Sequence, residues 1–118
     1  MEKVLFINAC VRPNSRTLEL AQHVLEKLSC QVEEVKLYEE DLSPLTLKEM
    51  ELRDKSAEEQ DFSNDIFSLP KQFAGADVIV IGAPYWDMMF PAILKNYFEK
   101  VTVNGLTFAY GKNGIPYG

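Results

Sequence analysis

The sequence has few of the residues on which disulfide scaffolds, metal sites and nucleic-acid interfaces depend. Its 118 residues include two cysteines and one histidine, and the formal net charge is −6. Two cysteines are too few for a disulfide framework, and no Cys, His or Asp cluster has metal-ligand spacing. The acidic balance and the lack of any apolar run near the roughly 18 residues of a membrane span disfavour nucleic-acid and membrane partners. We therefore expect a cytoplasmic protein with reduced thiols.

The sequence does contain an alternation of apolar strands and amphipathic helices. Continuous apolar runs predict buried strands, and apolar residues that recur every three or four positions predict helices. The stretch 39–75 is expected to lie over one face of the sheet, with its second helix interrupted near Pro70. The tail after residue 103 is expected to be loop with a short extended piece. The predicted strands are 3–8, 31–38 and 77–84, and the predicted helices are 15–28, 47–60, 66–76 and 92–101.

These elements predict one α/β domain over residues 1–118, with three layers and a parallel sheet. A strand, a helix and a strand joined by short loops form a right-handed unit, which gives the spatial strand order 2-1-3. The strand at 77–84 is the most apolar and is expected to be central, yet this order leaves it at an open edge, which soluble proteins avoid. We expect the chain to be the front part of a longer domain; the alternative is a neighbouring strand from another chain.

The loop "NACVRPNSRT" (8–17) joins the first predicted strand to the first helix. In an open parallel sheet, ligands bind beyond the carboxyl ends of the strands, where the strand order reverses. Free N–H groups at the start of a helix favour an anion there, and the side chains of Arg12, Ser15, Arg16 and Thr17 add charge and hydroxyl donors. A well-capped helix would explain all of these residues except the two arginines.

The same loop contains the Cys-x5-Arg-Thr pattern of a cysteine phosphatase. A low-molecular-weight tyrosine phosphatase also carries this pattern just after its first strand, with the thiolate as nucleophile and successive loop N–H groups holding the phosphoryl oxygens. Here Cys10 and Arg16 would have those roles, but Pro13 removes one N–H from the loop. We keep the phosphatase as the weaker alternative. Elsewhere no carboxylate pair suggests acid–base chemistry, so no catalytic side chain is assigned.

The loop "GAPYWDMMFP" (82–91) follows the third predicted strand and faces the same crevice. It gathers three aromatic residues and two methionines where a polar loop is usual. A planar and largely apolar ring could stack there, with backbone groups fixing its polar edge. A subunit interface favours the same residues, so the composition leaves both interpretations open.

Together the two loops resemble those of the flavodoxin-like NAD(P)H-dependent oxidoreductases, the quinone reductases and azoreductases. The family pattern G-S-P-R-x-x-S-x-T falls on residues 9–17, and P-x-Y-N-F-x-x-P followed by L-K falls on residues 84–95. "NGLTFAYG" resembles the family segment G-x-T-F-x-Y. Cys10 and Val11 replace the family's Ser-Pro, and Trp86 replaces its Tyr.

The resemblance implies an enzyme that passes two electrons from NAD(P)H through FMN to a quinone, azo or nitro acceptor, as a homodimer. FAD remains an alternative to FMN. Ser15, Arg16 and Thr17 would hold the flavin phosphate, with Arg12 nearby. The isoalloxazine ring would be framed by Pro84, Tyr85, Trp86, Asp87 and Met88.

The chain ends before the fourth and fifth strands of that family. In the family, the loop after the fourth strand completes the flavin site and contributes to the dimer. Two further alternatives therefore stay open beside the oxidoreductase: a flavodoxin-like protein without bound flavin, and a one-electron flavodoxin-type carrier. A flavin titration distinguishes the first of these, and rapid reduction by NAD(P)H distinguishes the second.

Overall fold

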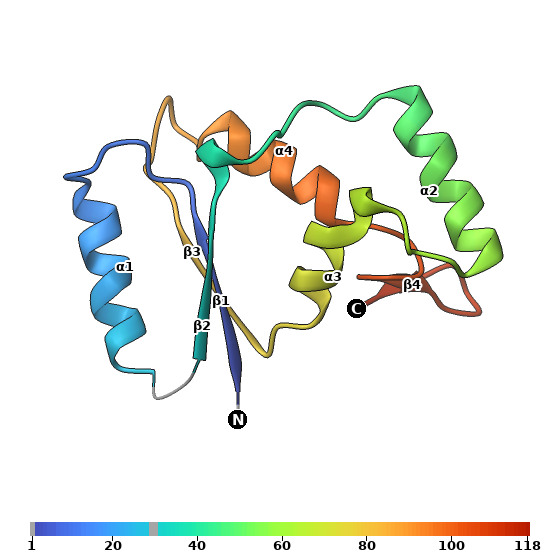
Figure 1. Cartoon of the computed structure of the whole chain (residues 1–118), viewed down its shortest axis with the longest axis horizontal. Helices are drawn as coiled ribbons and strands as arrows, with labels where there is room; N and C mark the ends of the chain where they lie inside the picture. The colour runs from blue at the N-terminus through green and yellow to red at the C-terminus, as the bar shows by residue number, and fades with distance from the viewer. Residues whose placement is uncertain (1, 29–30) are drawn as a thin grey trace.

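The computed structural model describes residues 2–28 and 31–118, and it places helices on both faces of a parallel sheet (Figure 1). The sheet order is β2-β1-β3, which confirms the predicted fold class and strand order. Helix α1 covers one face, and α3 and α4 lie on the other (Figure 1). The elements are β1 (Lys3–Asn8), α1 (Arg16–Glu26), β2 (Gln31–Lys36), α2 (Leu47–Glu59), α3 (Ser68–Ala74), β3 (Val78–Gly82) and α4 (Ala92–Val101).

Strand β1 is the centre of the core. Its residues from Val4 to Asn8 are all buried, because neighbours on both sides and helices on both faces cover them. On the α4 face, Leu5 and Ile7 pack into a cluster with the fully buried Tyr97. Full burial of a leucine or isoleucine side chain contributes about 1.5–3 kcal/mol to the free energy of unfolding.

On the opposite face, a glycine lets α1 approach the sheet closely. A Cβ added at Gly82 would lie 3.2 Å from a ring carbon of Phe6 and 3.4 Å from the Cβ of Ala21. The side chain of any larger residue would push α1 away from the strand end. Gly82 therefore fixes the distance between α1 and β3 at the end of the sheet where the two loops emerge.

Strand β3 forms an edge of this sheet and β1 its centre, as the predicted order 2-1-3 requires. The second strand ends earlier than predicted. It stops at Lys36, since Leu37 turns into the core and begins a single turn of 3-10 helix, Leu37–Glu39. Helix α1 likewise ends at Glu26 rather than near residue 28.

Pro70 does not interrupt the helix that contains it. It occupies the third position of α3, where a helix N–H has no intrahelical partner to lose, and a 3-10 turn at Asp65–Phe67 precedes it. Pro91 lies just before α4, as its N-cap residue. In the tail, two short strands, β4 (Ala109–Tyr110) and β5 (Pro116–Tyr117), pair as a hairpin.

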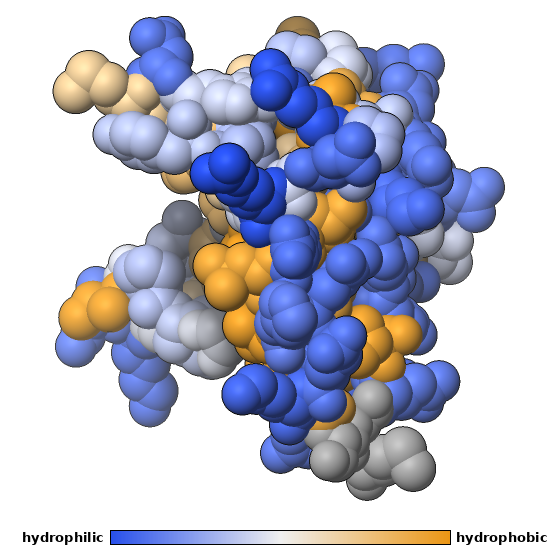
Figure 2. Space-filling view, turned by 90° about the vertical axis from the view of Figure 1, so that its left-hand side faces the viewer, coloured by the Kyte–Doolittle hydropathy of each residue, from blue (hydrophilic) through white to orange (hydrophobic). Residues whose placement is uncertain are grey.

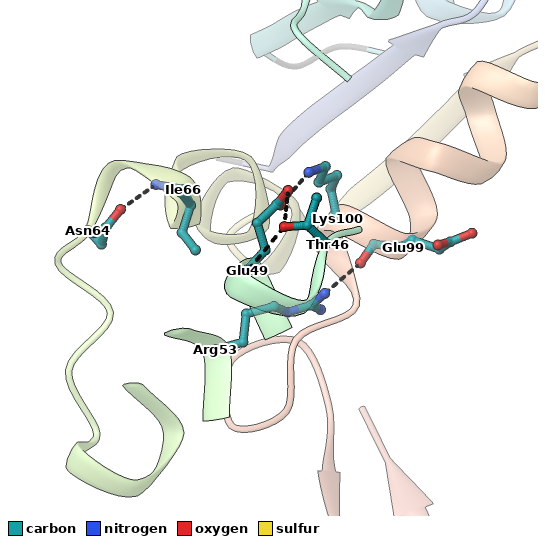
Figure 3. Close-up of polar contacts among 7 residues, drawn as sticks. All are labelled: Thr46, Glu49, Arg53, Asn64, Ile66, Glu99 and Lys100. Carbon is teal, nitrogen blue, oxygen red and sulfur yellow. Dashed lines mark hydrogen bonds and ion pairs between the residues drawn. The ribbon is translucent and has the colours of Figure 1, made fainter. Parts of the chain in front are cut away.

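Helix α2 does not lie over the sheet, contrary to the prediction for residues 39–75. It stands beyond α3 and α4 at the far end of the molecule (Figure 1). Polar contacts attach it there: Glu49 pairs with Lys100, and the guanidinium of Arg53 donates to the carbonyl of Glu99 at 3.1 Å (Figure 3). Arg53 also donates to the carbonyl of Thr102. These carbonyls belong to the end of α4, so α2 caps that helix.

Within residues 2–28 and 31–118, no helix is long and apolar enough to cross a membrane.

Candidate functional site

The first loop leaves the sheet at Asn8 and is held to β3 before it turns into α1. The N–H of Ala9 donates to the carbonyl of Gly82 at 2.8 Å, and the N–H of Cys10 donates to Oδ1 of Asn8 at 2.9 Å. Asn8 in turn donates through Nδ2 to Glu34 of β2 at 3.0 Å. The buried Asn8 side chain therefore ties the loop to the neighbouring strand.

Ser15 begins helix α1. Its side chain accepts a hydrogen bond from the N–H of Leu18 at 3.2 Å, and its carbonyl accepts from Glu19. In the described part of the chain, the N–H groups of Arg16 and Thr17 keep no intrahelical partner. Two amides at the positive end of a helix dipole therefore remain free to bind an anion.

A pocket of about 330 Å³ lies in front of this helix start, between the loops after β1 and β3. Its charged lining residues are Arg12 and Arg16, so the pocket is locally positive in a chain whose net charge is −6. Both guanidinium groups are exposed, which leaves them free to reach a ligand. The other lining residues are Cys10, Val11, Asn14, Ser15, Pro84 and Trp86. The crevice that the strand order predicted is thus present, and it suits a small anion.

The thiol of Cys10 faces the sheet end as well as the pocket. Its Sγ lies 3.6 Å from the carbonyl oxygen of Gly82. Three of the amides that a phosphatase loop would need are not available: Cys10 N–H bonds to Asn8, Ser15 N–H bonds to the carbonyl of Arg12, and Pro13 has none. The geometry therefore disfavours the phosphatase interpretation, in which successive N–H groups surround a phosphoryl group.

The second loop turns back on itself in a tight two-residue turn. Trp86 and Met89 exchange both backbone hydrogen bonds, at 2.7 and 2.9 Å. The two central residues are Asp87, with φ 50°, and Met88, with φ 63°, which is the left-handed pair of a type I′ turn. Asparagine and glycine are the usual residues at these positions, so Met88 holds a backbone conformation that its side chain disfavours.

A second, apolar hollow lies beside this turn. The groove has a volume of about 550 Å³ and reaches from the turn to the first residues of α4. Trp86 lines both this groove and the positive pocket, so the two cavities share one aromatic wall. The other lining residues are Asp87, Met89, Phe90, Pro91, Ala92, Lys95 and Asn96. A ligand with an anionic end and a flat apolar end would find both surfaces within one crevice.

The residues predicted for the site divide into three sets. Arg12, Ser15, Arg16, Pro84 and Trp86 line the positive pocket together. Asp87 lines the apolar groove. The remaining three line neither cavity: Thr17 offers its N–H at the helix start, whereas the side chains of Tyr85 and Met88 are 76% and 82% exposed.

The sequence reasoning missed two residues at this end of the sheet. Asn8 was treated only as the polar last residue of the first strand, although it holds the loop to Glu34. Tyr38, beyond the end of β2, lies near Cys10. Partial burial, with a smaller contribution from the Cys10 thiol, raises the pKa of Tyr38 above its ordinary value. The sequence could have indicated this, because Tyr38 lies at the end of the second predicted strand, and that strand was expected to lie beside the first.

Among the residues that the structure describes, no group of His, Cys, Asp and Glu could hold a metal ion. The crevice itself is lined by two arginines and by Trp86, beside the free amides at the start of α1.

Known proteins are similar to this chain over nearly all of its length. The chain is 37% identical to FMN-dependent NADH:quinone oxidoreductase 2 of Clostridium acetobutylicum, with 97% of this chain and 60% of that protein covered. It is 35% identical to the FMN-dependent NADH:quinone oxidoreductase of Coprothermobacter proteolyticus, with the same coverage. The chain thus spans about 60% of the length of these relatives.

The fold agrees with solved structures over the whole chain. An azoreductase from Bacillus anthracis superposes with a TM-score of 0.77 at 28% identity, covering 100% of this chain and 63% of that one. These relatives are the quinone reductases and azoreductases that the two loops resemble, which confirms the resemblance. Because the sequence profile of the flavodoxin-like fold matches residues 2–118, the chain belongs to the flavodoxin-like fold family.

Proposed function

We propose that this chain is the flavin-binding part of an FMN-dependent NAD(P)H oxidoreductase that reduces quinone or azo compounds. The observation that carries the proposal is the shared wall at Trp86, which joins a positive pocket to an apolar groove. FMN has the matching form, with a phosphate at one end and a planar ring at the other. When bound, FMN supplies the two-electron chemistry that connects NAD(P)H with an acceptor.

In this proposal the first loop holds the flavin phosphate. The guanidinium groups of Arg12 and Arg16 pair with its charge, and the amides of Arg16 and Thr17 donate to its oxygens. The hydroxyl oxygen of Ser15 already accepts from Leu18, but its proton remains free to donate. The capping interaction and the phosphate contact therefore use different atoms of one side chain.

The second loop borders the ring. The apolar side chain of Trp86 offers a flat surface, and the backbone of residues 84–88 supplies amide and carbonyl groups for the ring's polar edge. No side chain of this chain is assigned a proton-transfer role. The protein's part is to bind and orient the cofactor and the acceptor, and the tight turn at Asp87 and Met88 fixes where the loop's amides point.

We further propose that residues 1–118 form the greater part of one flavodoxin-like domain, and that the protein is a cytoplasmic homodimer. The exposed side chains of Tyr85, Met88 and Met89 form an apolar patch beside the groove, and such patches are typical of subunit interfaces. The use of NAD(P)H, an intracellular reductant, supports the location. Light scattering during gel filtration measures the mass, and a monomer at micromolar concentration would contradict the dimer.

The test compares FMN with riboflavin, which lacks the phosphate. Isothermal titration of the Arg16→Ala variant should show FMN binding weakened by about tenfold and riboflavin binding unchanged, because the exposed guanidinium contacts only the phosphate. Lys27→Ala is the matched control, since Lys27 is an exposed basic residue at the other end of α1. An equal loss for both flavins would count against the assignment. Oxidation of NADH with a benzoquinone acceptor then tests the activity itself.

A further inference from the structure

A further cavity lies between the first turns of α2, the 3-10 turn before α3 and the end of α4. Its volume is about 210 Å³, and it shares no lining residue with the positive pocket or the apolar groove. Helix α2 stands at one end of the molecule, whereas α1 and the face that Figure 2 shows lie at the other (Figure 1). The cavity is therefore separate from the crevice for which we propose flavin binding.

The floor of this cavity is apolar. Phe67 and Val103 are each 1% exposed, and Leu42 and Leu69 are half-buried and pack against the core. Aliphatic and aromatic side chains of this kind can remove the hydrocarbon part of a small ligand from water. The floor alone would accept any apolar molecule of the right size, so the charged side chains of the lining decide which ligand fits.

The two basic side chains of the cavity already have partners within the chain. Lys100 pairs with Glu49, which also accepts from the hydroxyl of Thr46 at 3.4 Å, and only 18% of the Lys100 side chain is exposed. The guanidinium of Arg53 donates to backbone carbonyls at the end of α4. Figure 3 shows these contacts between α2 and α4. An anionic ligand would therefore compete with existing contacts for either basic group.

The remaining charged groups of the cavity are three carboxylates, those of Glu40, Asp41 and Asp65. Among the residues that the structure describes, none of the three forms an ion pair. Burial, with a smaller contribution from Glu40, raises the pKa of Tyr97, so the Glu40 carboxylate lies near a buried hydroxyl that has no hydrogen-bond partner among the described residues. The uncompensated charge of the cavity is therefore negative.

We propose that this cavity binds a small organic cation, an ammonium group on a short aromatic or aliphatic body. The ammonium group pairs with the carboxylates of Glu40 and Asp65, and the body lies on the apolar floor at Phe67. Both parts are needed, because an exposed ion pair by itself contributes little to binding. The volume of the cavity is below the roughly 300–1,000 Å³ of pockets for drug-sized ligands, so it suits a molecule with a single ring.

The experiment follows the amide NMR signals of the isotope-labelled chain at pH 7, with phenethylammonium as the probe. Titration should shift the signals of Leu69 and Val103, which line the cavity, to a plateau and leave the signal of Val24 in α1 unchanged. Phenylethanol has the same body without the charge and should bind about tenfold more weakly, and phenylacetate should bind more weakly still. No flavin is added, so the result does not depend on the proposed function.

Variants that remove one charge and keep the shape of the side chain test the carboxylates. Glu40→Gln and Asp65→Asn should each weaken phenethylammonium binding by about threefold. Glu58→Gln is the matched control and should have no effect, because Glu58 is an exposed carboxylate of α2 that does not line the cavity. The proposal is overturned if the Leu69 and Val103 signals reach no plateau, or if phenylethanol binds as tightly as phenethylammonium. It is also overturned if Glu58→Gln weakens binding as much as the cavity variants, since the net charge of the chain alone would then explain the attraction.

Discussion

The left-handed turn of the second loop allows a prediction about stored strain. Met88 has φ 63° in a type I′ turn, a conformation that costs a residue with a Cβ about 1–2 kcal/mol. Met88→Gly removes that Cβ. The side chain of Met88 is 82% exposed, so its removal takes little apolar area out of the folded interior and should hardly lower the free energy of unfolding. The dominant consequence of the change should be relief of backbone strain.

Part of this stabilisation is lost, because glycine raises the conformational entropy of the unfolded chain. That added entropy destabilises the folded state by about 0.4–1 kcal/mol, so the central values leave a net stabilisation of about 0.8 kcal/mol. For a domain of this size, such a gain raises the midpoint of thermal unfolding by about 2–5 °C. Differential scanning calorimetry resolves a shift of that size.

The control is Met88→Ala, which shortens the same exposed side chain but keeps the Cβ. It should leave the midpoint of thermal unfolding almost unchanged. Gln60→Gly provides an independent comparison, because Gln60 caps α2 at φ 52° far from the crevice and should also stabilise. The reasoning is refuted if Met88→Gly and Met88→Ala shift the midpoint equally, or if the glycine variant lowers it.

Two further substitutions test the packing around α4. Tyr97 is fully buried, and its hydroxyl has no hydrogen-bond partner among the described residues, so Tyr97→Phe should stabilise by about 1 kcal/mol at pH 7 in urea unfolding. Burial, with a smaller contribution from Glu40, raises the pKa of Tyr97 above its ordinary 10.0. As the pH rises, the hydroxyl of Tyr97 therefore loses its proton in the unfolded chain before it does so in the folded chain. The free energy of unfolding should then fall above pH 10 more steeply in the wild type than in Tyr97→Phe. Equal slopes of the free energy of unfolding against pH would contradict this. Arg53→Ala leaves carbonyls at the end of α4 without donors and should destabilise by about 1–2 kcal/mol in urea unfolding, whereas an unchanged midpoint would mean that water replaces the guanidinium.

The part of the fold that follows from continuous apolar runs could be predicted from the sequence. The bounds of β1 and α4 agree with the predicted 3–8 and 92–101, because a buried strand and an amphipathic helix both leave strong local patterns. The strand order followed from the right-handed connection of successive parallel strands, and the crevice followed from the rule that ligands bind beyond the carboxyl ends of the strands where the order reverses. For this reason the arginines of the first loop, Arg12 and Arg16, were expected to meet Trp86, which is distant from them in sequence.

Features that depend on long-range contacts could not be predicted. The placement of α2 rests on Arg53 and on the ion pair between Glu49 and Lys100, which no local pattern reveals. The type I′ turn was not predicted either, because Asp87 and Met88 differ from the Asn-Gly sequence that is typical of such a turn. Helix α3 was expected to break at a proline that its first turn in fact accommodates.

The most direct test of the central claim uses the single tryptophan of the chain. Trp86 stands between the positive pocket and the apolar groove, so its fluorescence reports on a ring bound there. Titration with FMN should quench that fluorescence to a plateau at one flavin per chain, and Arg16→Ala should shift the curve to higher FMN concentration by about tenfold. A purely linear decrease with added FMN, without a plateau and with no difference between the two proteins, would contradict a flavin site in this crevice.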